Sequence, residues 1–472
     1  MKQGLLPYRI ELHNDDEHLT AWAGLPLLLE ALRAVVTKRL FRNLRTALGY
    51  RGWKTVRRHL ESLVLLIGSG ASCIDDLAML RADRGLSRLL GYELSSPTQA
   101  KVFLYRFHQS QEGLRLSAEQ DAQLSVAGKA QVRPEGPGLQ ALERVVAQVV
   151  AHLQTHRRHY RATLDVDATI IEAHKASALR AYEGTVGYQP QLCWWAEHGV
   201  WLVDEFRDGN VNAEFEARRF LERVKQSVPP SVRQLRLRAD SAFYNEAALS
   251  WADDQGIAFA VSADMSKGLA GRIRAISGTH WRPYRSLNTD QEEREWAEVV
   301  DFVPDWKRNH RKHGLPFRYI AIRVRSRQRD LLFDDSQRWR HFAVVTNMDW
   351  DGERLLRWQR EKQGTIEQGH RVLKNELAAS PLPCGRFGAN AAWLRLNILM
   401  HNLLELLKVE ALPSELASCR PKALRFRLFH LVGRLIHTGR QLILRLAASH
   451  PFAAAYRQAR AQLRSVAQQT ST

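Results

Sequence analysis

Hydrophobic residues change their spacing near residue 161 of the chain. Upstream of it, apolar residues recur at helical intervals in 19–36, 60–70, 72–91, 96–110 and 138–156. The polar stretch 125–140, which contains glycine and proline, is predicted to be a linker. The N-terminal part is therefore predicted to be helical.

Between 161 and 265 the pattern alternates as in β-strands. Strands are predicted at 163–171, 189–197, 200–210, 234–244 and 257–265, with helices at 212–228 and 245–256. The order β-β-β-α-β-α-β is typical of the ribonuclease H-like α/β fold, a mixed sheet with helices on both faces. Parts of this order also occur in unrelated folds.

The segment 266–350 is predicted to be a mainly β insertion, with strands at 294–303, 317–327 and 340–348. Helical spacing resumes afterwards, at 352–362, 361–377 and 389–409 and in the basic segment 426–447. We therefore predict five parts: a helical region (1–137), the first part of the α/β core (138–265), the insertion (266–350), the helices that complete the core (351–410), and a basic helical C-terminal region (411–472).

Charge indicates a polyanionic partner. The net charge is +19 and the isoelectric point about 10.1, which favours nucleic acid over an anionic membrane surface. Segment 38–59 holds eight Lys or Arg and no acid, and no acid follows Glu415. Such segments suit contact with a phosphate backbone, although basic helices packed on an acidic part of the same chain are an alternative.

The cysteines and apolar runs exclude several classes. The four cysteines show no CxxC pair, so neither a zinc ribbon nor a disulfide framework is predicted. Apolar runs such as 63–68 are far shorter than a bilayer span, and the N-terminus lacks the apolar core of a signal peptide. We therefore expect a cytoplasmic protein without a membrane anchor.

Two acids occupy strand positions where neutral residues would be less costly. Asp167 lies in the first predicted strand and Asp240 at the end of the fourth. These strands are neighbours in a ribonuclease H-like sheet, so the two carboxylates are expected to meet at one edge. Their repulsion would be removed by Mg²⁺, which prefers carboxylate oxygens. Asp165 shares the face of Asp167 and is a rival for this role.

A third acid, Glu367, lies in segment 361–377, which we predict to be one amphipathic helix. It shares a face with His370, Arg371 and Lys374. Glu367 is expected to complete the metal site, and its basic neighbours to bind phosphate. An ordinary solvated face with internal ion pairs is the alternative.

The segments 164–169 (LDVDAT), 237–244 (LRADSAFY), 344–349 (VVTNMD) and 364–393 resemble the bacterial insertion-sequence DDE transposases, most closely the insertion-sequence group numbered 1380. The resemblance implies that Asp167, Asp240 and Glu367 are the catalytic residues and bind two Mg²⁺ ions, with Mn²⁺ as a substitute.

The family signature around the Glu matches this chain only in part. It also places a Lys seven residues after the Glu, as Lys374 is here. An Arg four residues before the Glu and a Tyr seven before are replaced by Gln363 and Arg360. Arg360 is therefore a candidate for phosphate contact, with Lys362 as the other.

The resemblance further implies cut-and-paste transposition in the bacterial nucleoid. Residues 1–137 would then be a DNA-binding or dimerisation region, and 138–265 with 351–410 the catalytic core. A homodimer would bind the terminal inverted repeats and the target DNA, nick the ends, close hairpins and transfer strands. Trp281, Trp296 and Trp306 are candidates for the aromatic that stacks on a flipped base. Two alternatives are a metal-dependent DNA nuclease of the same fold and a DNA-binding derivative without catalysis.

Overall fold

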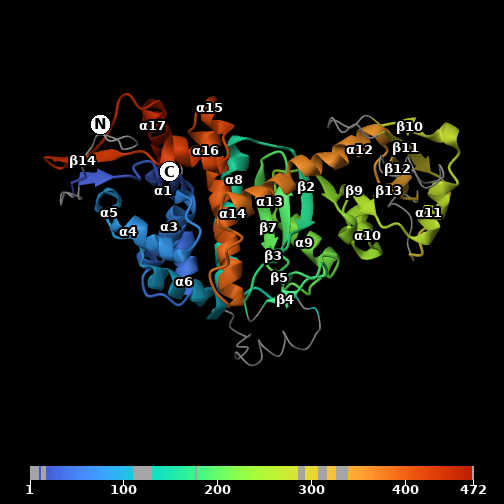
Figure 1. Ribbon diagram of the computed structural model, residues 1–472, viewed down its shortest axis with the longest axis horizontal. Coiled ribbons are helices and arrows are strands. Elements are labelled where there is room, and N and C mark those ends of the chain that lie inside the picture. Colours follow the sequence, from blue (N-terminus) through green and yellow to red (C-terminus); the bar gives the residue numbers. More distant parts are fainter. Residues whose placement is uncertain are drawn as a thin grey trace, which may run out of the picture.

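A nine-stranded mixed sheet runs from the middle of the molecule to one of its ends (Figure 1). The computed structural model describes residues 10–11, 18–109, 130, 132–175, 178–284, 293–306, 316–325 and 339–469. Much of the predicted linker 125–140, namely 125–129 and 131, lies outside the described residues. The strand order is β10-β11-β12-β13-β9-β8-β2-β6-β7.

The five core strands are those that the alternating pattern predicts. They are β2 (Arg161–Ala168), β6 (Gln191–Trp195), β7 (Val200–Glu205), β8 (Gln234–Ala239) and β9 (Ala258–Ala263). Strand β2 pairs with β6 in antiparallel and with β8 in parallel orientation, and β8 pairs in parallel with β9. With α9 (Ala217–Ser227) and α10 (Glu246–Asp254) between the strands, the order confirms the ribonuclease H-like fold.

The predicted β insertion continues this sheet. Its strands are β10 (Arg282–Pro283), β11 (Arg294–Val299), β12 (Arg318–Arg325) and β13 (Trp339–Thr346), after the helix α11 (Lys267–Arg274). Strand β13 pairs with β9 in antiparallel orientation, so the insertion extends the edge that β9 would otherwise leave unpaired. Helix α12 (Gly352–Arg360) covers these strands with Leu355 and Leu356, which pack in one cluster with Trp296.

Helices from both ends of the chain pack together on one side of the sheet (Figure 1). The N-terminal ones are α1 (Pro26–Val35), α2 (Lys38–Ala47), α3 (Trp53–Ser69), α4 (Leu77–Ala82), α5 (Arg84–Leu90) and α6 (Pro97–Gln109). The C-terminal ones are α15 (Ser414–Ala417), α16 (Pro421–Leu424) and α17 (Ala453–Gln469), the last packed on α1. Helix α14 (Phe387–Glu410) is buried along nearly all its length and joins them to α8 (Pro137–His156) and to the sheet.

The predicted helix 426–447 is wrong. Strands β14 (Gly433–Thr438) and β15 (Gln441–Leu446) form a hairpin there, and β14 also pairs with β1 (Leu19–Thr20). Gly439 has a φ of +55° at the turn, which a glycine adopts without strain. The apolar residues that follow helical spacing in this segment also alternate, and the turn decides between the two patterns.

Two smaller differences also concern strands. The helix expected from residue 19 begins only at Pro26, because Leu19 and Thr20 form β1. A three-stranded sheet of β3 (Ile171–Glu172), β5 (Val186–Tyr188) and β4 (Leu179–Arg180) was not predicted. No single helix in the described part of the chain is long and apolar enough to cross a membrane, although α3 and the helical segment after it, bent by 100°, pass that test as a pair.

Candidate active site

Two of the predicted catalytic acids lie side by side where neighbouring strands end. In the parallel pair formed by β2 and β8, Val166 is aligned with Ala239. The next residues, Asp167 and Asp240, therefore reach the same edge of the sheet. Asp240 accepts a hydrogen bond from the backbone N–H of Ala242 (3.2 Å), which holds its side chain at the start of a short 3₁₀ turn. The predicted meeting of the two carboxylates is observed.

The Asp167 carboxyl has an unusual charge state. Burial, together with the nearby carboxylates of Asp240 and Glu367, raises its pKa from 3.8 to about 7. The Lys362 ammonium, 3.5 Å from Asp167 Oδ1, opposes this rise. A buried acid among other acids is the arrangement that a divalent cation stabilises.

The segment that carries Glu367 is not one helix. After α12, a 3₁₀ turn (Glu361–Gly364) leads to α13 (Ile366–Asn375), and Thr365 between them has non-helical backbone angles (φ −111°, ψ −89°). Glu367 thus lies in the first turn of α13, is exposed, and lines a cavity together with Asp240. The prediction of a single helix over 361–377 is therefore wrong: the chain turns at Thr365, whose hydroxyl bonds to Asp165 on β2.

Asp165, the rival of Asp167, is part of a buried ion pair. Arg238 on β8 donates to both of its oxygens (Nε–Oδ1 2.5 Å, Nη2–Oδ2 2.9 Å), and neither side chain is exposed by more than 1%. Nη1 of Arg238 also bonds to the Trp358 carbonyl (2.7 Å) and to Glu361 (3.0 Å). Both Asp165 oxygens therefore accept hydrogen bonds from Arg238. Arg238 also contacts the segment that precedes α13.

Helix α13 lies directly on the sheet because residue 369 is glycine. A Cβ atom there would come within 2.8 Å of Trp201 and 3.0 Å of Trp194. The next residue, His370, is buried 5.2 Å from the Trp201 ring and 3.8 Å from Asp167 Oδ2. Burial lowers the pKa of His370 to about 3, with Lys374 and Lys362 adding to the effect, so its imidazole is neutral.

The basic residues predicted on the Glu367 face take different places. Arg371 is exposed. Lys374 donates to the Ile170 carbonyl just beyond β2 (2.7 Å), and burial lowers its pKa. Of these three residues only Arg371 is exposed, whereas His370 is buried and Lys374 is half-buried, so the predicted basic face is divided.

Two cavities meet at Asp240. The first, of about 480 Å³, is also lined by Glu367, Lys362 and Arg360, and from the insertion strands by Arg294, Arg340 and Phe342. The second, of about 730 Å³, is lined by Lys374 and by the residues that follow β2. The first cavity thus brings carboxylates and four basic side chains together.

Sequence reasoning missed the contribution of the insertion strands to this cavity. Arg340 and Phe342 are two residues apart on β13 and so share a face, which is the signal that could have revealed them. Phe342 is 48% exposed and lines the first cavity beside Arg340 and Ile322.

The tryptophan candidates for base stacking pack elsewhere. Trp281 and Trp296 are buried, with exposed fractions of 7% and 4%. Trp306 packs on Tyr244, with 4.8 Å between ring centroids. None of the three lines either cavity.

The carboxylates fit a divalent cation by their chemistry, since all three offer the oxygen ligands that Mg²⁺ prefers. They are not drawn tightly together: within the described ranges, the only group of three His, Cys, Asp or Glu ligand atoms lying within 4.8 Å of one another is formed elsewhere, by His152, His156 and Glu410. The fold is therefore of the ribonuclease H-like class, and the acids at its sheet edge are of the kind that a divalent cation would bind.

The chain belongs to the family described as transposase DDE domain group 1, whose model matches residues 5–468. It is therefore a DNA transposase. Its structure is similar to that of a piggyBac transposase synaptic complex with hairpin DNA, with a TM-score of 0.51 and 10% identity, over 85% of this chain and 79% of the other. No curated protein sequence matches the chain significantly. Assignment to the insertion-sequence group numbered 1380 stays a prediction.

Proposed function

We propose that this transposase moves its element by cut-and-paste transposition, and that Asp167, Asp240 and Glu367 are its catalytic residues. The observation that carries the proposal is the alignment of Asp167 with Asp240 beside the start of α13, with a pKa of about 7 at Asp167. The three carboxylates would hold two Mg²⁺ ions, with Mn²⁺ as a substitute. When bound, such ions activate the attacking oxygen and stabilise the leaving one.

The side chains around the carboxylates have separate roles in this proposal. Lys362 stabilises the ionised form of Asp167, which is the form that binds a cation. Arg360, Arg294 and Arg340 line the first cavity and would hold the phosphates of the strand to be cut. The exposed Arg371 would contact a phosphate further along that strand.

The nicked end would then be converted into a hairpin. The freed 3′-hydroxyl would attack a phosphodiester of the opposite strand, joining the two strands of the transposon end and releasing the flanking DNA with a 3′-hydroxyl. This tight closure is easier when one base leaves the stack. Phe342 is exposed inside the basic cavity and offers a flat apolar surface for that base. Strand transfer into target DNA would follow hairpin opening.

Inverted-repeat binding is assigned to basic surfaces far from the carboxylates in sequence. On α2, Lys38, Arg39 and Arg42 are exposed. The β14–β15 hairpin exposes Arg434, Arg440 and Arg445. We propose that these surfaces bind the terminal inverted repeats within a homodimer that joins two transposon ends, acting on DNA of the bacterial nucleoid.

The test uses purified protein, labelled inverted-repeat DNA and Mg²⁺. Cleaved hairpin ends are expected, whereas nicks without hairpins would favour a nuclease of the same fold. Asp167→Asn should abolish cleavage and retain DNA binding, with the exposed Asp75→Asn as an active control. Cleavage by Asp167→Asn would refute the site. A variant that lost DNA binding together with cleavage would point to a DNA-binding role for Asp167 in place of a catalytic one.

A further inference from the structure

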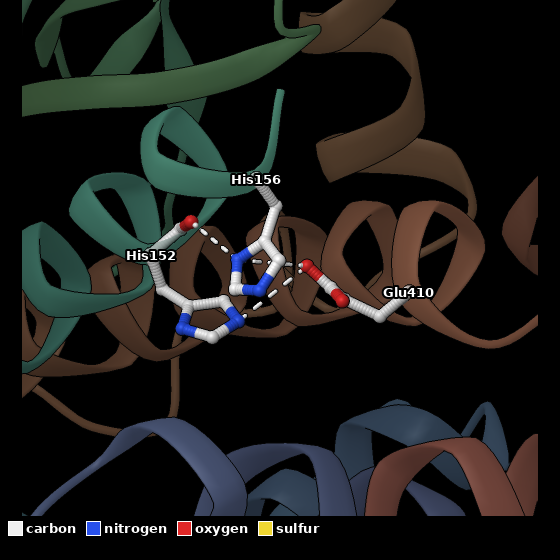
Figure 2. Close-up of side chains that lie close together, drawn as sticks. All are labelled: His152, His156 and Glu410. Atoms are coloured by element: carbon white, nitrogen blue, oxygen red, sulfur yellow. Dashed lines mark hydrogen bonds and ion pairs between the residues drawn. The ribbon is translucent and has the colours of Figure 1, made fainter. Parts of the chain in front are cut away.

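A second group of potential metal ligands lies where two long helices end (Figure 2). His152 and His156 project from the last turns of α8, and Glu410 is the last residue of α14. Glu410 Oε1 lies 3.4 Å from His152 Nε2 and 3.3 Å from His156 Nδ1. The two imidazole rings are one helical turn apart, with centroids separated by 4.3 Å.

These distances are longer than those of strong hydrogen bonds. A charged imidazole donating to a carboxylate brings N and O to about 2.7–2.9 Å. Four ligands around a tetrahedral Zn²⁺, with bonds of about 2.0–2.1 Å, are instead separated by roughly 3.3 Å. The observed spacing therefore matches the edges of a tetrahedral coordination shell.

Two of the atoms are buried without a hydrogen-bond partner. Among the described residues, His152 Nε2 and Glu410 Oε1 find none, although the side chains are only 6% and 8% exposed. Leaving buried polar atoms unsatisfied is costly, and such atoms in native proteins call for an explanation such as an ion.

The surrounding backbone also favours a cation. Both helices direct their C-terminal ends toward the group, and helix C-termini carry partial negative charge. Glu410 adds a full carboxylate at that place, where helices ordinarily carry Lys, Arg or His. The field at the group is thus negative from three sources.

We propose that His152, His156 and Glu410 form a Zn²⁺ site that clamps α8 to α14. Two imidazoles one turn apart and a carboxylate are a ligand set that Zn²⁺ takes, and the fourth ligand is water, which enters beside the 38% exposed His156. Ligation through Nδ1 replaces the contact of that atom with the His152 carbonyl oxygen (3.2 Å), because a metal-bound nitrogen carries no proton.

This site is separate from the catalytic carboxylates. Strand β2 begins at Arg161, close after the end of α8, and Asp167 lies six residues further along it. At about 3.3 Å per residue, the carboxylates are roughly 20 Å from the start of β2. The Zn²⁺ clamp would hold the helix that leads into the catalytic strand.

The experiment measures Zn²⁺ binding to the chelator-treated full chain by calorimetry, in excess Mg²⁺ so that the carboxylate site is filled. Tight binding of one equivalent is expected, and Zn²⁺ should raise the melting temperature. Glu410→Gln and His156→Gln should each lose that equivalent and the rise in melting temperature. His174→Gln, which alters an exposed His–Glu pair with no third ligand, and Asp167→Asn should keep both.

Circular dichroism shows whether each variant is folded. If Glu410→Gln does not fold, the test rests on His156→Gln, which changes a partly exposed side chain. A Co²⁺ substitute should give the visible spectrum of a four-coordinate site in the wild type and lose it in His156→Gln. Equal Zn²⁺ binding by wild type and His156→Gln, or no bound equivalent in the wild type, would overturn the proposal.

Discussion

Replacing Asp167 by asparagine should make the metal-free protein more stable at neutral pH. The pKa of Asp167 is raised from 3.8 to about 7, because the carboxyl is buried near Asp240 and Glu367. Its ionised form therefore destabilises the folded state. Between about pH 4 and about pH 7 the folded state binds one proton more than the unfolded state. The free energy of unfolding of the wild type therefore falls as the pH rises through this range.

The magnitude follows from the same pKa values. A rise from 3.8 to about 7 corresponds to roughly 4 kcal/mol, at about 1.36 kcal/mol per pKa unit. Asparagine keeps part of the burial cost and loses the attraction of Lys362, 3.5 Å away in the wild type. We therefore expect Asp167→Asn to gain about 2 kcal/mol at pH 8, half of the full figure.

The assay is chemical unfolding of both proteins with chelator, at pH 4.5 and pH 8. The stability advantage of Asp167→Asn should be small at the lower pH and largest at the higher one, while the exposed Asp75→Asn shows neither. Added Mg²⁺ should stabilise the wild type more than the variant, because it binds the native carboxylates. A wild type more stable than Asp167→Asn at pH 8 without metal would refute the reasoning.

Three further changes test other parts of the site. Gly369→Ala places a Cβ against Trp201, so we expect the free energy of unfolding to fall by about 1–3 kcal/mol and DNA cleavage to be impaired while DNA binding is retained. Gly271→Ala adds a Cβ in open space and should keep both stability and cleavage. Asp165→Asn should cost about 3–5 kcal/mol in unfolding experiments and, unlike Asp167→Asn, lower stability at every pH where Arg238 is charged. Phe342→Ala should retain nicking but reduce hairpin formation at least severalfold on labelled ends, and unchanged hairpin yield would contradict its stacking role.

The core of the fold was predictable because the signals for it are local. Alternation places Asp167 and Asp240 near the ends of their strands, and the parallel pairing of β2 and β8 brings them together. The order of strands and helices favours the ribonuclease H-like fold, in which these strands are neighbours. The catalytic roles of the three acids stay predictions that the cleavage assay tests.

What was missed depends on contacts between distant segments. At the break before α13, Thr365 bonds to Asp165, 200 residues away in the sequence, and no local pattern reveals this contact. The β14–β15 hairpin is supported by β1 near the other end of the chain. Such pairings override local spacing, and only the turn at Gly439 hints at the second one.

Arg238 explains how the fold tolerates repelling carboxylates at its edge. Its guanidinium bonds to Asp165 on β2, to the Trp358 carbonyl of α12 and to Glu361. One buried side chain therefore contacts both the strand of Asp167 and the segment that precedes the helix of Glu367. Breaking such a pair costs about 3–5 kcal/mol, which is comparable with the roughly 4 kcal/mol that the raised pKa of Asp167 represents. Arg238 thus links the strand of Asp167 to the segment before the helix of Glu367 through contacts that involve no metal ion.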